Sequence, residues 1–213
     1  NVVRELLDRQ IRPRVLVRKT SDSRPLEGLK VDLFYGDVRD VAAVQAACKG
    51  IDVVIHAAGY VKIGWFDRDL HWAINVEGTR NVATAINQQK GRLIHVSTVN
   101  TLGVAAVNQV ADEESINQPI LPCPYVESKR AAEDEIRQMV DKGLDAVIVQ
   151  PGYMLGPWDW KPSSGVMLLE VAGRFTPLAP RGAMRLCDSL DFAQGILAAI
   201  DRGTCCRHYL LPV

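Results

Sequence analysis

A tyrosine and a lysine four residues apart carry the proton chemistry that this chain could perform. Tyr125 and Lys129 lie in a segment whose pattern predicts a helix, and residues four apart on a helix project from the same face. The ammonium of Lys129 could therefore stabilise the ionised phenol of Tyr125 and make it an unusually acidic proton donor. Such a pair suits the transfer of a proton to a carbonyl oxygen. The pair alone is a weak signal, because the chain has five tyrosines, so its weight depends on its surroundings.

Apolar periodicity predicts strands that alternate with helices along the chain. The expected strands are residues 14–17, 31–35, 52–56, 92–96, 146–149, 185–187 and 208–211, and the expected helices are residues 1–8, 41–47, 67–89, 125–142, 166–172 and 190–200. Short apolar strands separated by helices indicate a parallel sheet covered on both faces, the doubly wound α/β architecture. The Pro- and Gly-rich segment 151–165 is interpreted as an active-site loop rather than a domain boundary.

The residues that end the expected strands are the candidates for ligand binding, because ligands of such sheets lie beyond the carboxyl ends of the strands. These ends are Arg18 and Lys19, Asp37 and Val38, Ala57 to Gly59, Ser97 and Thr98, and Pro151 to Tyr153. Small side chains at 57–59 would let a flat, nicotinamide-type cofactor approach the backbone. Asp37 could accept the amino group of an adenine while Val38 packs on its ring. The alternative is that the small residues only close a turn and Asp37 caps the next segment.

The composition argues against several classes of partner. Lys plus Arg number 25, as do Asp plus Glu, so the formal net charge is zero and no basic stretch offers a nucleic-acid footprint. No apolar run approaches the roughly 20 residues of a membrane helix, and nothing resembles a secretory leader, so we expect a cytoplasmic protein without a membrane partner. The five cysteines and four histidines lack metal-ligand spacing, which predicts free thiols in a reducing compartment and no metal site.

Several short motifs occur together in the order and at the spacing of one enzyme family. They are residues 36–40, 56–59, 75–79, 95–98, 125–129, 151–157 and 187–193. With these motifs the chain resembles an extended short-chain dehydrogenase/reductase, a member of the NAD-dependent epimerase/dehydratase superfamily. Within it the chain most resembles the dihydroflavonol-4-reductase and 3β-hydroxysteroid dehydrogenase-like branch. The resemblance covers nearly the whole chain and implies a Rossmann-like fold.

The chain departs from the family pattern at both ends. The family's first strand and its Gly-rich pyrophosphate loop should lie immediately before Asn1, and related proteins continue beyond Val213 into a substrate-binding lobe. That first strand is central in such sheets, so we expect that the sequence is incomplete or that its ends are disordered. For a protein that truly begins at Asn1, we expect poor affinity for a dinucleotide. We expect residues 1–213 to form a single NAD(P)-binding domain, in which about 151–187 begin the substrate lobe.

The resemblance assigns roles to three residues of the site. It implies that Tyr125 donates a proton to the substrate oxygen, that Thr98 hydrogen-bonds this oxygen, and that Lys129 holds the cofactor ribose and acidifies Tyr125. Ser97 is expected to support the cofactor side of the pocket. The residues expected to bind cofactor are Arg18, Lys19, Asp37, Val38, Ala57, Ala58, Gly59, Val96, Ser97, Tyr125, Lys129, Pro151, Gly152, Tyr153 and Met154.

The end of the second family strand predicts the choice of cofactor. An acidic residue there usually accepts the ribose hydroxyls of NAD, whereas a basic residue accommodates the 2′-phosphate of NADP. The positions hold Arg18 and Lys19, with no carboxylate before Asp22. Because the planar guanidinium suits a phosphate, we expect NADP, with NAD as the alternative. The alternative is that Arg18 and Lys19 are only solvated charges on a loop, in which case they would not select between NADP and NAD.

Three functions compete for these residues. The leading expectation is an NAD(P)-dependent oxidoreductase that reduces a ketone or aldehyde of a small organic substrate, or oxidises the alcohol in reverse. The second is a nucleotide-sugar epimerase or dehydratase that keeps NAD tightly bound. The third is a non-catalytic dinucleotide sensor, which the intact pair of Tyr125 and Lys129 disfavours. The family also suggests a homodimer through the helices 67–89 and 125–142.

Overall fold

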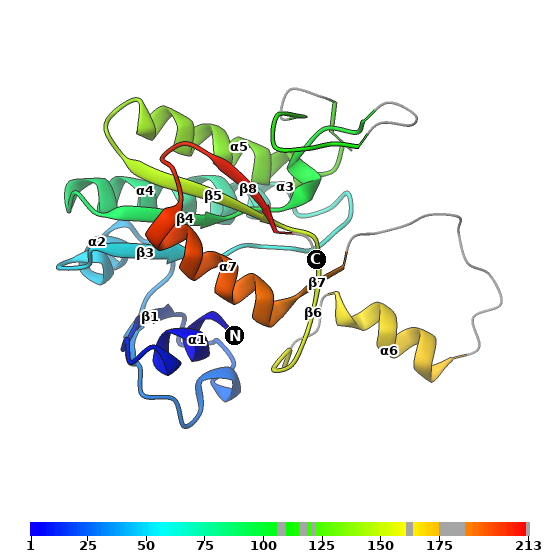
Figure 1. Ribbon diagram of the computed structural model, residues 1–213, viewed down its shortest axis with the longest axis horizontal. Helices are drawn as coiled ribbons and strands as arrows, with labels where there is room; N and C mark the ends of the chain where they lie inside the picture. Colours follow the sequence, from blue (N-terminus) through cyan, green and yellow to red (C-terminus); the bar gives the residue numbers. More distant parts are fainter. Residues whose placement is uncertain (106–109, 116–118, 121, 161–163, 175–185, 212–213) are drawn as a thin grey trace.

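The computed structural model describes residues 1–105, 110–115, 119–120, 122–160, 164–174 and 186–211 (Figure 1). Every strand pairing in these residues is parallel. Four strands, β3 (Val53–His56), β4 (Arg92–Val96), β5 (Asp145–Pro151) and β8 (His208–Leu211), form the main sheet in the order β3-β4-β5-β8. The expected parallel α/β sheet is confirmed.

Helices cover both faces of this sheet, as the doubly wound architecture requires. Figure 1 shows α4 (Gly78–Gln88) and α5 (Pro124–Val140) on one face and α7 (Ser189–Arg202) on the other, where α1 (Val2–Asp8) also lies. The side chains of β5 divide accordingly. Ala146 and Ile148 pack with Ile86 of α4 and Ile136 of α5, whereas Val147 and Val149 pack with Ile196 of α7.

Alternation along one strand therefore builds two apolar layers, because successive strand residues point to opposite faces of the sheet. All four of these β5 side chains are at most 1% exposed. Burial on both faces explains why the strand reads in the sequence as a continuous apolar run rather than as an alternating pattern.

Two further sheets stand beside the main one. Strand β1 (Arg14–Val17) pairs with β2 (Asp32–Tyr35), and β6 (Tyr153–Leu155) pairs with β7 (Leu186–Asp188). Within the part of the chain that the structure describes, β1 is not paired with β3. Helix α2 (Val41–Cys48) follows β2, and the carboxylate of Asp40 caps it by accepting a hydrogen bond from the backbone nitrogen of Ala43.

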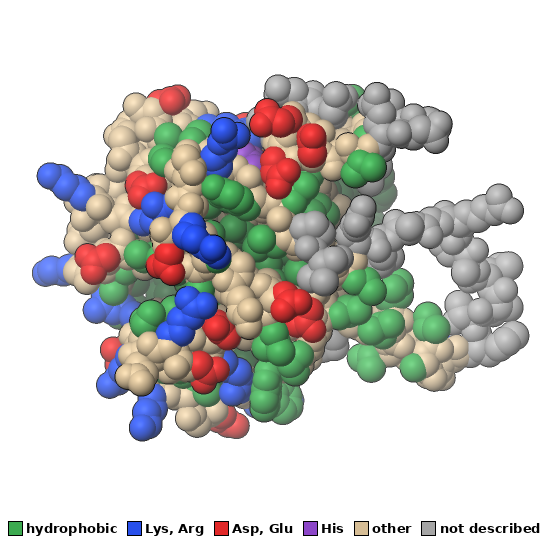
Figure 2. Space-filling model, viewed as in Figure 1, with side chains coloured by type: hydrophobic (Ala, Val, Ile, Leu, Met, Phe, Trp, Pro, Cys, Tyr) green, Lys and Arg blue, Asp and Glu red, His purple; other side chains and the backbone are tan. Residues whose placement is uncertain are grey.

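The segment 151–165, interpreted from the sequence as an active-site loop, contains the short strand β6. Three residues are too few to show a strand period, and β6 exists only through its pairing with the distant β7. Downstream, α6 (Gly165–Gly173) exposes apolar side chains, and Figure 2 shows them gathered over this helix. The assignment of about 151–187 to a substrate lobe stays a prediction.

The single long helix expected at 67–89 contains an irregular middle. It consists of α3 (Arg68–His71), a π-helical segment η2 (Trp72–Glu77) and α4. Segments with π-type hydrogen bonding occur frequently at functional sites. Gly78 follows the π-helical segment, and a Cβ there would lie 2.8 Å from the Val38 Cγ2 atom. Glycine therefore lets this helix approach the end of β2.

Two further expectations can be compared with the described residues. All five cysteines are free, as their scattered spacing predicts. Among the helices described, none is long and apolar enough to cross a membrane. Residue 185, the expected start of the seventh strand, lies outside the described residues, and β7 begins at Leu186.

Candidate active site

The end of β4 places Thr98 beside the start of α5. Val96 is the last residue of β4, and Thr98 precedes the 3-10 turn η3 (Val99–Thr101). The hydroxyl of Thr98 caps this turn by accepting a hydrogen bond of 3.3 Å from the backbone nitrogen of Asn100. Tyr125 lies in the first turn of α5, and the Thr98 side chain is close enough to lower the pKa of its phenol. The structure thus brings together the two hydroxyls expected at the substrate oxygen.

Lys129 lies one helical turn further along α5 and is 5% exposed. Its Nζ donates a hydrogen bond of 2.7 Å to the carbonyl oxygen of Val96. Burial lowers the pKa of Lys129 to about 8, and the negative charge of Glu133 opposes this shift. The ammonium is consequently costly to keep charged, and it is held at the end of the same strand that positions Thr98.

Burial is the largest influence on the pKa of the Tyr125 phenol. It raises the pKa of the Tyr125 phenol, and the hydrogen bond with Thr98 acts in the opposite direction. Lys129 is not among the groups that shift this pKa. The acidification of Tyr125 by Lys129 therefore stays a prediction for the bound state.

A cavity of about 1010 Å³ opens over these side chains. Besides Thr98, Tyr125 and Lys129, it is lined by most of the residues expected at the nicotinamide end, namely Ala57, Gly59, Val96, Ser97, Pro151, Gly152, Tyr153 and Met154. These residues come from the ends of β3, β4 and β5 and from β6. Because the three main-sheet strands are parallel and adjacent, their carboxyl ends meet at one edge of the sheet.

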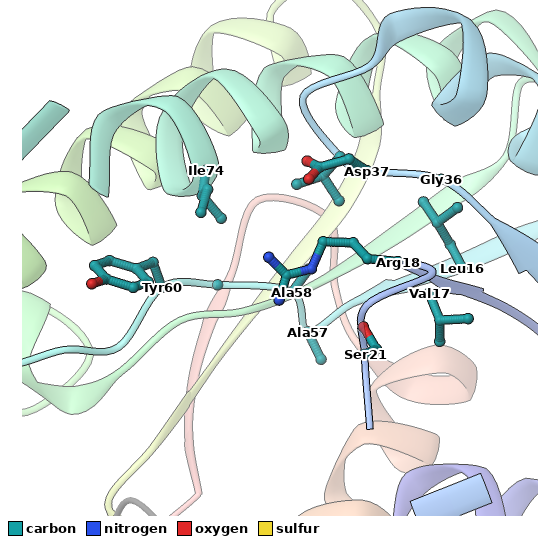
Figure 3. A pocket seen from close by; sticks show the side chains of 12 residues that line it. Leu16, Val17, Arg18, Ser21, Gly36, Asp37, Ala57, Ala58, Tyr60 and Ile74 are labelled. Atoms are coloured by element: carbon teal, nitrogen blue, oxygen red, sulfur yellow. The ribbon is translucent and has the colours of Figure 1, made fainter. Parts of the chain in front are cut away.

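A second cavity, of about 300 Å³, lies at the ends of β1, β2 and β3. The expected residues Arg18, Asp37, Val38 and 57–59 line it. Figure 3 shows the Arg18 side chain extending from the end of β1 over this pocket, together with the previously unassigned Ser21 and Ile74. The two cavities share Ala57 and Gly59. These small residues therefore lie at the junction between the two cavities.

Two residues of the cofactor set behave differently from the expectation. Lys19 is not among the residues that line this cavity. The carboxylate of Asp37 is engaged with Arg39, whose Nη2 lies 2.8 Å from its Oδ2 atom and whose backbone nitrogen donates to its Oδ1 atom. This hydrogen bonding lowers the pKa of Asp37 to about 2. An adenine amino group would have to share a carboxylate that Arg39 already holds.

Asn75 links three segments of the chain through its side chain. It is 1% exposed, and its Nδ2 donates to the carbonyl oxygen of Tyr60 at 3.0 Å and to the Ser128 hydroxyl at 2.9 Å. Its Oδ1 accepts a hydrogen bond of 2.7 Å from the Tyr60 nitrogen. The π-helical segment η2 carries Asn75 and so fixes the loop after β3 against α5.

His56 in β3 and His95 in β4 are both buried. Burial lowers the pKa of His56 to about 3 and that of His95 well below its usual value, and the charge of Lys129 acts in the same direction. His56 Nε2 lies 3.0 Å from the hydroxyl of Thr79. Neither ring nitrogen of His95 has a partner among the described residues. Sequence reasoning missed His71, which is buried next to Tyr60 and Tyr125.

Comparison with known proteins assigns the chain to a family. Residues 1–210 match the model of the NAD dependent epimerase/dehydratase family. The chain is 32% identical over 215 residues to sterol demethylase protein B of Methylococcus capsulatus, covering 99% of this chain and 65% of that protein. It is 35% identical over 208 residues to a Synechocystis protein provisionally named dihydroflavonol 4-reductase, covering 95% and 60%. The chain belongs to the NAD dependent epimerase/dehydratase family and spans less than two thirds of the length of these relatives.

Solved structures agree with this assignment. The crystal structure of gox2253 superposes with a TM-score of 0.90 at 32% identity, covering 99% of this chain and 65% of that chain. The UDP-glucose 4-epimerase of Thermus thermophilus, solved with NAD, superposes with a TM-score of 0.84 at 24% identity, covering 100% and 73%. At that identity the second likeness shows the fold alone.

The two cavities fit an elongated dinucleotide. Arg18 and Asp37 line the smaller cavity, Tyr125 and Lys129 line the larger one, and the small residues Ala57 and Gly59 belong to both. Side chains without bulk at this junction leave room for a ligand that passes from one cavity to the other. Charged and hydrogen-bonding groups at both ends are suited to the polar parts of a dinucleotide.

Proposed function

We propose that the protein is an NADP-dependent reductase that converts a ketone or aldehyde to an alcohol, with Tyr125 as proton donor. The observation that carries the proposal is that Thr98, Tyr125 and the buried Lys129 line the same large cavity, with Thr98 close enough to Tyr125 to lower the pKa of its phenol. A general acid must lie within hydrogen-bonding reach of the reacting oxygen, and the hydroxyls of Tyr125 and Thr98 would bind that oxygen together.

Tyr125, Thr98 and Lys129 would each have a separate role in the reduction. When bound, a reduced nicotinamide supplies the hydride to the carbonyl carbon. Tyr125 transfers its phenolic proton to the carbonyl oxygen, and Thr98 donates a hydrogen bond that orients the same oxygen. Lys129 holds the nicotinamide ribose and stabilises the tyrosinate left behind. In the reverse direction Tyr125 removes the proton of the alcohol.

Arg18 supports the choice of NADP. It lines the smaller cavity and comes from the end of β1, where a guanidinium can bind the 2′-phosphate through two parallel hydrogen bonds. The carboxylate nearest along the chain, Asp22, is bound to Arg24 through several hydrogen bonds. Asp22 is also not among the described residues that line the smaller cavity, so its carboxylate does not compete with Arg18 for the ribose.

The lining of the larger cavity favours an uncharged, apolar substrate. Val61, Ile63, Leu102 and Met154 contribute to it, and Lys129 is the one charged side chain among its described lining residues. A nucleotide diphosphate would need several cationic donors, whereas a sterol or a dihydroflavonol, the compounds in the names of two relatives, would not. This lining therefore favours a reductase over a nucleotide-sugar epimerase or dehydratase.

A substrate panel tests the proposal. The intact protein is incubated with NADPH or NADH and either apolar ketones and aldehydes or nucleotide sugars, and loss of the reduced cofactor's absorbance is followed. We expect consumption of NADPH with an apolar carbonyl compound. Inversion of a nucleotide sugar without net cofactor consumption would instead show an epimerase, and binding without any turnover would show a dinucleotide sensor.

Two properties expected of the whole protein remain proposals beside this one. A homodimer through α4 and α5 predicts a doubled mass in sedimentation, which a monomer would contradict. A cytoplasmic location can be checked by cell fractionation.

A further inference from the structure

A buried carboxylate lies beneath the candidate active site. Glu133 is 1% exposed and lies one helical turn after Lys129 on α5. Its Oε1 accepts hydrogen bonds from the hydroxyls of Ser97 and Thr101, the latter at 2.7 Å, and from Gln150 Nε2 at 3.1 Å. These donors come from the end of β4, from η3 and from β5. The Oε1 atom of Glu133 therefore links three elements of the site.

This set of donors suits an ionised carboxylate. Three neutral donors directed at one oxygen stabilise the anion, and the Nη2 of Arg137 lies 3.4 Å from the other oxygen. Arg137 also pairs with Asp134 and contacts the His208 ring at 3.3 Å, so its charge is shared. A buried carboxylate with so many partners is expensive to remove or to leave unpaired.

We propose that Glu133 is a positioning residue: its carboxylate holds the turn that carries Thr98 and supplies the negative charge that balances the buried ammonium of Lys129. The inference rests on the proposed function, because it concerns how Thr98 and Lys129 are prepared for it. Ser97 therefore supports the site indirectly, since its hydroxyl donates a hydrogen bond to Glu133.

The first part of the role follows from the geometry of the turn. Ser97 and Thr101 flank Thr98 in the chain, and both donate to Glu133. The Thr101 hydroxyl also lies 2.8 Å from the carbonyl oxygen of Thr98. Anchoring the turn on both sides fixes the backbone of Thr98, and with it the hydroxyl that lines the cavity beside Tyr125.

The second part follows from the charges that face Lys129. His56 on β3 and His95 on β4 face it, and burial keeps both neutral. Arg130 and Arg137 on α5 and His208 on β8 face Glu133, and Glu113 lies near His208. Glu133 is the carboxylate that opposes the loss of the Lys129 proton.

Two substitutions separate the roles of bonding and charge. Glu133→Gln keeps an oxygen for the three donors and removes the charge, so we expect the pKa of Lys129 to fall by about one unit. Glu133→Asp keeps the charge and shortens the reach, so we expect that pKa to change little while kcat falls about tenfold through the loosened turn, with KM nearly constant. Glu135→Gln on the same helix is the control, because Glu135 pairs with Arg80 at the surface and should alter neither quantity.

The pKa of Lys129 is measured by NMR titration of isotope-labelled lysine side chains, with Lys129→Met to assign the signal. This readout needs no turnover, so it separates a failure of this inference from a failure of the reductase proposal. If Glu133→Gln does not fold, Arg137→Gln provides the opposite test: removing a cation beside Glu133 should raise the pKa of Lys129. A Lys129 pKa that neither Glu133→Gln nor Arg137→Gln moves would overturn the inference and leave Glu133 as a packing residue.

Discussion

The two cavities differ in how far the protein prepares them before any ligand binds. Around Tyr125 the polar groups are buried: Thr98, Lys129 and Glu133 are each at most 6% exposed, and Lys129 and Glu133 are hydrogen-bonded within the protein. Around Arg18 the charged groups are at least partly exposed and form pairs with close neighbours in the sequence, such as Asp37 with Arg39. The region proposed for the chemistry is thus preorganised, whereas the cavity around Arg18, proposed for the cofactor, keeps charges that a ligand can recruit.

The difference has an energetic reason. Exposed ion pairs contribute about 0–1 kcal/mol and rearrange easily, so Arg18 can turn to a phosphate at little cost. Leaving a buried charge without its partner costs about 3–5 kcal/mol, so the groups that bind Glu133 keep one arrangement. Catalysis depends on groups already placed where charge develops, and binding tolerates groups that adjust.

The comparison predicts the largest effect for Tyr125→Phe. Turnover should fall about 10²- to 10⁴-fold, because the proton donor is lost, while the dissociation constant for NADPH measured by calorimetry changes little. Tyr209→Phe is the control, since the Tyr209 hydroxyl bonds the backbone of Thr204 and not the cavity. Unchanged turnover in Tyr125→Phe would show that Tyr125 is not the proton donor. It would also weaken the distinction between the two regions.

A second prediction concerns acid stability of the buried region. The pKa of His56 is about 3 in the folded protein and about 6.5 when unfolded. Between these values the unfolded chain binds a proton that the folded protein excludes, so stability is lost as the pH falls. By pH 5 this amounts to about 2 kcal/mol, measurable by urea unfolding at pH 7 and pH 5. His56→Gln should reduce this pH dependence, and an unchanged slope would show that His56 does not contribute.

The third prediction addresses the exposed cavity. Arg18→Gln should raise the Michaelis constant for NADPH about tenfold, since a charge-assisted hydrogen bond contributes roughly 1.5–3 kcal/mol, and should leave that for NADH almost unchanged. Lys19→Gln is the matched control, because Lys19 lies outside the lining of the cavity. Equal losses with both cofactors would show that Arg18 does not select the 2′-phosphate.

The smallest effect is expected outside both regions. Arg80 on α4 and Glu135 on α5 form a surface pair with 2.6 Å between Nη2 and Oε1. A double-mutant cycle with Arg80→Ala and Glu135→Ala should give a coupling energy below about 1 kcal/mol. A larger coupling would mean that this surface pair, and not the buried groups around Glu133, sets the position of α5.

Particular residues show how much of the site was predictable. The spacing of Tyr125 and Lys129 predicted that they share one face of a helix. Glu133 lies four residues further along, so the same spacing predicts a carboxylate on that face of α5. That signal was available and was missed. Asn75 could not be assigned in advance, because its three partners depend on a π-helical segment that no simple periodicity indicates. Strand β6 could not be found either, since its pairing with β7 is a long-range contact.

The sequence by itself determined the alternation of strands and helices, the parallel sheet and the residue types at the strand ends, because these follow from local periodicity and chain connectivity. Tertiary structure decided which of these residues meet: it joined Thr98 to Tyr125, bound Asp37 to Arg39, left Lys19 outside the cavity and placed Glu133 beneath the site. Distances between side chains of different elements depend on packing across the whole sheet, and no local pattern in the chain encodes them.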